Sequence, residues 1–199
     1  MTRSIRLSEA ILFGLSGVVF VAALGLWSFG VRLNLSDSAP VGVWTTDSFH
    51  TDELSYGRMV SICPRDTATT RAMLAAGFLP VGSCSAGSVP LLKPIVALPG
   101  DLVSIDPDGV RVNGSLLANS APANTTVANI QLHGYGHDAG VTQSRYEVLE
   151  EQVWVVSSYS SNSYDSRYFG PLSISDIRWT ATPLLTRGDL AATYQRANP

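Results

Sequence analysis

Lys93 is the only lysine among the 13 Lys and Arg residues of this 199-residue chain. It lies in the run VPLLKPIVALPGD, whose apolar residues indicate a buried strand. Because burying an ammonium group is costly, we expect the pKa of Lys93 to fall and its neutral amine to be favoured. A neutral amine is a general base, a role closed to the permanently charged arginine. The alternative is a lysine whose stem packs on the sheet while its ammonium group reaches water, and the local sequence leaves both open.

A base needs a nucleophile, and Ser38 is the candidate. It stands in LNLSDSAPVGVW, where Pro40 and Gly42 predict a tight, non-helical segment that can hold a hydroxyl exposed. Ser, Asp, Pro and Gly are also ordinary residues for a linker. Ser38 alone therefore does not distinguish a catalytic segment from a connecting one.

Together these two segments resemble the serine-lysine signal peptidase family. The family has a Ser-x-Pro motif just after an N-terminal anchor, then a lysine strand ending in Leu-Pro-Gly-Asp, a short turn and a Ser-x-Asp-Ser-Arg-x-x-Gly motif. The matching segments occur in the same order and cover most of the chain: Ser38-Ala39-Pro40, Lys93 to Asp101, Val112-Asn113-Gly114 and Asn162 to Pro171.

Within this family the chain is most similar to the TraF-type conjugal-transfer branch. Members of the branch carry Asn-x-(Ser/Thr)-x-Ser-x-Pro-x-Gly near the anchor, as in residues 34–42, and a Cys-Pro followed by a second cysteine, as in Cys63 and Cys84. Two departures separate the chain from housekeeping leader peptidases. Ala39 replaces their usual Met, and residues 157–161 (SSYSS) stand in place of their Gly-Asp-Asn-Arg-Asp run.

The resemblance implies acyl transfer by a Ser-Lys dyad. Ser38 would attack the scissile carbonyl while neutral Lys93 takes its proton. The oxyanion would be held by the Ser38 backbone amide and the Ser36 hydroxyl. Ser163 matches the position whose hydroxyl orients the lysine amine.

The resemblance also gives Asp165 and Arg167 a place in the site wall, as an ion pair. In the TraF branch the aspartate at this position is implicated directly in activity, so Asp165 is a candidate catalytic residue. A purely structural salt bridge is the equally weighted alternative.

The function implied is a membrane-anchored serine endopeptidase that needs no cofactor and matures a pilin precursor for conjugation or type IV secretion. Some members of the branch close the cleaved pilin into a ring, and these residues do not decide between hydrolysis and cyclisation. A general signal peptidase acting on exported preproteins is the alternative enzyme. A non-catalytic, membrane-tethered β assembly factor is the alternative outside enzymes.

An uncharged N-terminal run predicts the anchor. No residue from Ala10 to Val31 is charged, and a helix of this length spans about 33 Å, enough for the ~30 Å hydrocarbon layer. We therefore expect a cytoplasmic N-terminus (residues 1–8), a transmembrane helix (9–31) in contact with lipid, and a periplasmic domain (32–199) of a bacterial inner-membrane protein. Arg3 and Arg6 support this orientation. The alternative of a cleaved signal peptide fits less well, because the run is long and no clean A-x-A site precedes Arg32.

Charge and histidine placement exclude other classes of function. Residues 1–32 carry a net charge of +2, from Arg3, Arg6, Arg32 and Glu9. Because the whole chain has a net charge of −3, residues 33–199 carry −3 − 2 = −5. This negative charge argues against nucleic-acid binding. A Ser-His-Asp triad or a metal site built on His50, His133 and His137 is disfavoured, because Gly134 and Gly136 break any helix that would align the last two.

The domain after the anchor is predicted to be mainly β, with antiparallel coiled sheets. Cys63 and Cys84 predict a single disulfide in an oxidising compartment. Pro107-Asp108-Gly109 predicts a hairpin turn, and Trp27 and Trp44 are placed at the outer membrane interface. The expected strands cover 57–62, 92–98, 102–105, 110–112, 146–149 and 152–157, a short helix 66–76, and surface loops 113–145.

Overall fold

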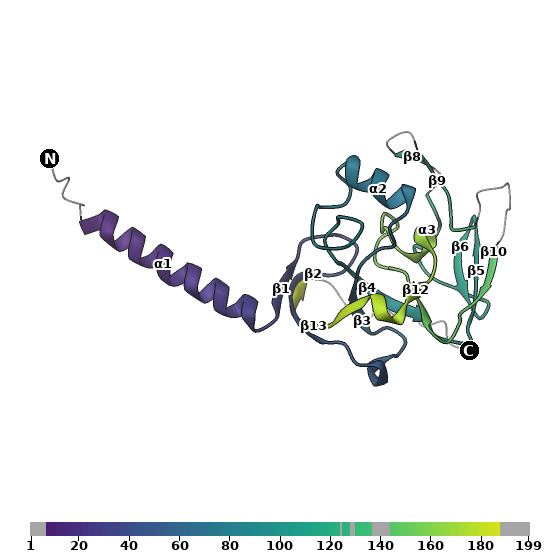
Figure 1. Cartoon of the computed structure of the whole chain (residues 1–199), viewed down its shortest axis with the longest axis horizontal. Coiled ribbons are helices and arrows are strands. Elements are labelled where there is room, and N and C mark those ends of the chain that lie inside the picture. The colour runs from purple at the N-terminus through teal and green to yellow at the C-terminus, as the bar shows by residue number, and fades with distance from the viewer. Residues whose placement is uncertain (1–6, 124, 128–129, 137–143, 188–199) are drawn as a thin grey trace.

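The computed structural model describes residues 7–123, 125–127, 130–136 and 144–187. Its N-terminal helix α1 (Leu7–Ser28) projects away from the β domain as a single rod (Figure 1). The helix ends three residues before the predicted boundary, because Gly30 has a φ of 77° and Val31 already belongs to a strand. A side chain at Gly30 would collide with the Thr46 carbonyl, so the turn out of the helix requires glycine.

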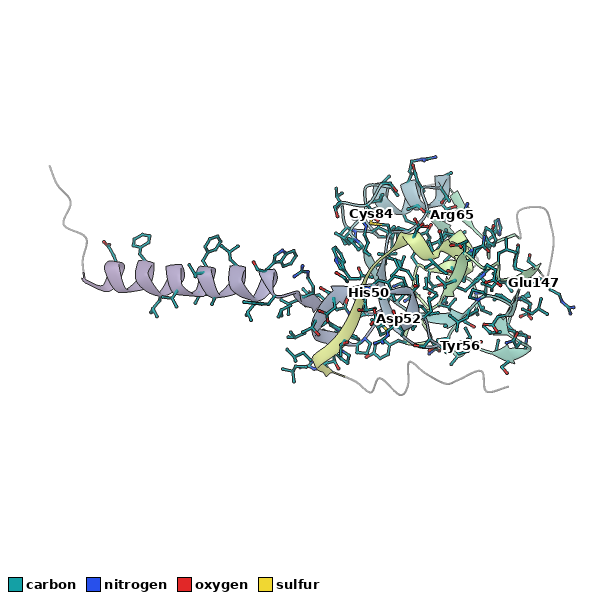
Figure 2. The ribbon with its side chains drawn as sticks, turned by 60° about the horizontal axis from the view of Figure 1, so that its bottom comes forward. His50, Asp52, Tyr56, Arg65, Cys84 and Glu147 are labelled. Atoms are coloured by element: carbon teal, nitrogen blue, oxygen red, sulfur yellow. A yellow bond between two sulfur atoms is a disulfide. The ribbon has the colours of Figure 1, made fainter. Side chains whose placement is uncertain are left out.

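The apolar side chains of α1 are exposed. Figure 2 shows them projecting from the helix on more than one side, and Phe13, Val18 and Trp27 are each more than half exposed. Over the described part of the chain, no helix is both long enough and apolar enough to cross a membrane. The predicted membrane-spanning role of α1 therefore stays a prediction.

Seven antiparallel strands form the main sheet, in the order β1-β2-β13-β3-β4-β11-β12. The register shifts within β13 and between β11 and β4, as expected for coiled sheets. β13 comes from the end of the described chain and inserts between β2 and β3, which closes the centre of the sheet. The strands are β1 (Val31–Asn34), β2 (Val41–Ser48), β3 (Met59–Ile62), β4 (Leu91–Ala97), β11 (Gln152–Val155), β12 (Leu172–Ser173) and β13 (Ile177–Arg187).

A second sheet has the order β10-β5-β6-β7, and β8 pairs with β9. The predicted hairpin turn is confirmed, because Asp106 Oδ1 accepts hydrogen bonds from the Asp108 and Gly109 amides between β5 and β6. These strands are β5 (Leu102–Asp106), β6 (Gly109–Val112), β7 (Ser115–Leu116), β8 (Thr125–Val127), β9 (Ile130–Leu132) and β10 (Ser144–Glu147).

The prediction of surface loops over 113–145 was wrong for much of that stretch. It contains β7, β8, β9 and the start of β10, and Leu117 and Ser120 are buried. Residues 124, 128–129 and 137–143 of the stretch lie outside the described residues. The polar composition suggested loops because the strands are very short and their pairing is not visible in a periodic pattern.

Short helices complete the domain: α2 (Ala68–Ala75), α3 (Ser166–Phe169), and the 3-10 turns η1 (Thr51–Glu53) and η2 (Ile174–Asp176). The predicted helix 66–76 is confirmed as α2. Thr67 caps it, since Thr67 Oγ1 accepts from the Thr70 amide at 3.0 Å. The predicted Cys63–Cys84 disulfide is present and joins the end of β3 to the segment before β4.

Candidate active site

Ser38 lies in a tight loop between β1 and β2. Asn34, the last residue of β1, holds this loop: its Nδ2 donates to the carbonyls of Ala39 at 3.0 Å and Pro40 at 3.2 Å, and its Oδ1 accepts from the Ser36 hydroxyl at 2.8 Å. Gly42 follows the loop with a φ of 151°. A side chain there would strike the backbone of β13, so the loop can return into the sheet only through glycine.

Trp44 fixes the loop from β2. Its indole Nε1 donates to the Pro40 carbonyl at 3.1 Å, and the side chain is buried. It packs in a small cluster with Ala39, Met59 and Ala181, which seats the loop on the sheet. The expectation that Trp44 lies at the membrane interface was therefore wrong, because its position in β2 turns the ring into the core. Trp27, on α1, is exposed, and its place at a membrane interface stays a prediction.

Lys93 reaches Ser38 from β4, where it pairs with Val60 of β3. Its Nζ lies 2.6 Å from Ser38 Oγ, and the residue is 2% exposed. The alternative of a lysine reaching water is excluded. The structure thus brings together the only lysine of the chain and the candidate nucleophile, 55 residues apart in sequence.

Burial controls the protonation of this amine. Loss of water around Lys93 lowers the pKa of its amine to about 8, with the charge of Asp165 acting to raise the pKa and the charge of Arg167 acting to lower it. A pKa near 8 leaves a substantial neutral fraction just above neutral pH. The amine can therefore accept a proton, which an ordinary surface lysine does poorly.

Hydrogen-bond partners around Ser38 limit where the hydroxyl hydrogens can lie. Ser36 Oγ lies 2.8 Å from Asn34 Oδ1 and 3.1 Å from Ser38 Oγ. Each hydroxyl carries one hydrogen, and Asn34 Oδ1 only accepts. When Lys93 is neutral, Ser38 can donate to Nζ while the Ser36 hydrogen goes to Asn34 or Ser38. The arrangement leaves the Ser38 proton free to pass to Lys93.

Asp165 and Arg167 form the predicted ion pair, with both side chains fully buried. Asp165 caps α3, accepting from the Arg167 backbone amide, and its oxygens lie 2.8 Å from Arg167 Nε and 3.0 Å from Nη2. The five guanidinium hydrogens of Arg167 are matched by five acceptors, two carboxylate oxygens and the carbonyls of Asn119, Ser157 and Ser161.

No hydrogen bond joins Asp165 to Ser38 or Lys93 among the described residues. The remaining contact of its Oδ2 is the Ser157 amide, at 3.0 Å. This geometry favours the structural alternative for Asp165 over direct participation in proton transfer. Its charge still acts on the Lys93 pKa at a distance.

The expected hydrogen bond from Ser163 to Lys93 is not formed. The Ser163 side chain is buried, but its hydroxyl has no hydrogen-bond partner among the described residues. It belongs to the same loop as Asp165, and its amide donates to the Ser160 carbonyl at 3.3 Å.

Ser157 is a site residue that sequence reasoning missed. Its hydroxyl donates to the Ser38 carbonyl at 2.6 Å. The available signal was the SSYSS segment, where the chain departs from housekeeping enzymes. Asn34 belongs to a motif identified in the sequence, but its hydrogen bonds to the loop that carries Ser38 were not predicted.

The two described histidines are exposed on the surface. His50 is exposed next to η1, His133 is exposed after β9, and His137 falls outside the described residues. Within the described ranges, no group of three His, Cys, Asp or Glu residues is placed to hold a metal ion.

Several known proteins are similar to this chain over most of its length. Among solved structures, a signal peptidase I from Enterococcus faecalis V583 aligns with a TM-score of 0.35 and 15% identity, over 64% of this chain and 96% of that chain. "Plasmid transfer protein TraF" of Escherichia coli is 33% identical over 86% of this chain and 94% of the relative. "Conjugal transfer protein TraF" of Agrobacterium tumefaciens (strain 15955) is 35% identical over 91% of this chain and 98% of the relative. The family described as signal peptidase, peptidase S26, matches residues 6–184, nearly the whole chain. With this match and these relatives, the chain belongs to the peptidase S26 family.

Proposed function

We propose that this protein is a membrane-anchored serine endopeptidase that cleaves a pilin precursor for conjugative transfer or type IV secretion. The observation that carries the catalytic part is the 2.6 Å contact between Lys93 Nζ and Ser38 Oγ at a buried lysine. The biological part rests on relatives named for plasmid and conjugal transfer.

Acylation follows from the proposed dyad. Ser38 Oγ attacks the scissile carbonyl carbon as neutral Lys93 takes the hydroxyl proton. The negative charge that develops on the carbonyl oxygen is stabilised by the Ser38 amide and the Ser36 hydroxyl, each worth roughly 3 kcal/mol in comparable sites. Lys93 then gives its proton to the leaving amine, and the carbon–nitrogen bond breaks.

Deacylation releases the product from Ser38. A water, or the free amino terminus of the pilin itself, attacks the acyl-Ser38 ester, and Lys93 again removes and returns the proton. Water yields a linear product, and the amino terminus yields a ring that is lighter by one water. The same dyad serves both outcomes.

We further propose that α1 anchors the protein in the bacterial inner membrane, with the β domain in the periplasm. Exposed apolar side chains continue beyond α1 at Phe29, Leu33 and Leu35, close in sequence to Ser38. The disulfide suits an oxidising compartment. A nucleophile near the bilayer would act on precursors that are themselves inserted in the membrane.

Mass spectrometry of the pilin precursor, co-expressed with the full-length protein, tests the proposal. We expect Ser38→Ala and Lys93→Arg to leave the precursor uncleaved, because the first removes the nucleophile and the second replaces the base with a permanent cation. Ser48→Ala, at an exposed serine of β2, should cleave like the wild type.

Cleavage by either dyad variant would refute the mechanism. Cleavage of many unrelated exported preproteins by the wild type would instead assign a general signal peptidase. A wild type that leaves every precursor intact would favour the assembly factor.

A further inference from the structure

We propose that Ser157 is the positioning residue of the nucleophile, and that it couples the buried Asp165–Arg167 pair to Ser38. This inference rests on the proposed function, since it gives Ser157 a part in the acylation step. It concerns a residue that lies 119 positions from Ser38 in the sequence.

The Ser157 hydroxyl has a fixed orientation. Its Oγ lies 2.6 Å from the Ser38 carbonyl oxygen and accepts from the Tyr159 amide at 3.2 Å. A carbonyl oxygen only accepts and a backbone amide only donates, so the single hydroxyl hydrogen must point to Ser38. The side chain is completely buried, which keeps water from competing for this bond.

The backbone of Ser157 is held on both sides by the ion pair. Its amide donates to Asp165 Oδ2 at 3.0 Å, and its carbonyl accepts from Arg167 Nη2 at 2.7 Å. Arg167 has no donor left to spare, as all five point to acceptors. Ser157 is therefore attached to a buried ion pair whose guanidinium hydrogens all have acceptors.

The other loop contacts leave this task to Ser157. Asn34 and Trp44 bind the carbonyls of Ser36, Ala39 and Pro40. Among the described residues, the Ser38 carbonyl is bound by Ser157. Fixing this carbonyl fixes the peptide plane that follows Ser38, and with it the direction from which Oγ meets Lys93 and the substrate. Asp165 can thus affect catalysis without touching either member of the dyad.

Single-turnover cleavage by the full-length protein in detergent micelles tests this role, using a peptide with Ala before the scissile bond and saturating enzyme. We expect Ser157→Ala to lower the rate constant roughly tenfold to hundredfold, the scale of loss when a reacting group is misplaced. Ser157→Cys keeps the shape of the side chain and a weaker hydrogen-bond donor, so its rate constant should lie between those of the wild type and Ser157→Ala. Ser88→Ala is the matched control, because Ser88 is equally buried and its hydroxyl has no hydrogen-bond partner among the described residues.

The limiting rate constant at saturating enzyme separates positioning from folding. With folded enzyme in excess over the peptide, loss of part of the folded protein raises the total enzyme concentration needed for saturation but leaves the limiting rate constant unchanged. The apparent pKa of the rate should stay at its wild-type value, since Ser157 makes no hydrogen bond to Lys93. A wild-type limiting rate constant in Ser157→Ala would overturn the proposal. If Ser157→Ala does not fold, a wild-type rate constant in Ser157→Cys would overturn it.

Failure of the proposed function would be distinct, because the wild type itself would then release no fragment.

Discussion

At the scale of single residues, the central feature is one amine held in an unfavourable place. Lys93 is buried in a strand, and the loss of water around its amine is the main cause that lowers its pKa to about 8. The same amine contacts Ser38, the candidate nucleophile. Stability given up at a functional residue is expected where chemistry needs a perturbed group.

Lys93→Met should stabilise the folded protein at neutral pH. The amine has a lower pKa folded than unfolded, so below pH 8 the folded state must keep a proton on a buried group. This penalty is fully present below pH 8, fades as pH rises toward the unfolded pKa of ~10.4, and amounts to roughly 3 kcal/mol. Chemical unfolding of wild type and variant from pH 7 to 10 measures it. The lowered pKa of Lys93 would be contradicted if the difference in unfolding free energy between the two proteins stayed constant from pH 7 to 10, or if Lys93→Met were less stable than the wild type at pH 7.

At the scale of elements, the short helix α3 and the loop before it act as a clamp. Asp165 begins the helix and Arg167 lies in its first turn, so one element supplies both halves of the ion pair. The guanidinium then ties together the carbonyls of Asn119, Ser157 and Ser161. Such a pair fixes the wall of the site more than it adds stability, because both charges had to be removed from water.

Asp165→Ala should destabilise the protein by about 3–5 kcal/mol, since it leaves the Arg167 charge buried and unpaired. The double variant Asp165→Ala with Arg167→Met should recover part of this loss, because it leaves no buried charge. Urea unfolding followed by tryptophan fluorescence compares the three proteins. If Asp165→Ala unfolds like the wild type, the structural assignment of Asp165 is wrong.

At the scale of the whole molecule, the dyad depends on strand order. Ser38 follows β1 at one edge of the main sheet, whereas Lys93 lies on β4, beyond β2, β13 and β3 (Figure 1). The loop must therefore fold over the sheet, and the cluster of Ala39, Trp44, Met59 and Ala181 holds it there. The site exists only when the complete sheet has formed.

This dependence explains which features the sequence could predict. The β5–β6 hairpin, α2 and the disulfide follow from local patterns of turn residues, caps and cysteines. β13 was missed, although it is the longest described strand, because Pro183 and the adjacent Leu184 and Leu185 interrupt the apolar-polar alternation of its first half. Its place is set by partners far away in the chain.

The site divides in the same way. Ser38, Lys93 and the Asp165–Arg167 pair were predicted because they lie in segments that resemble the motifs of the family. Ser157 was missed because its contact with Ser38 joins segments 119 residues apart in the sequence. The predicted hydrogen bond from Ser163 to Lys93 was wrong because it depends on how the loop packs against β4. Contacts of this kind are decided by tertiary packing.

The pH dependence of single-turnover cleavage tests the central claim most directly. With neutral Lys93 as the base, the rate should rise with pH through one apparent pKa of about 8 and level off above it, because only the unprotonated amine can take the Ser38 proton. A rate that stays constant from pH 6 to 10, or falls across that range, would contradict the dyad.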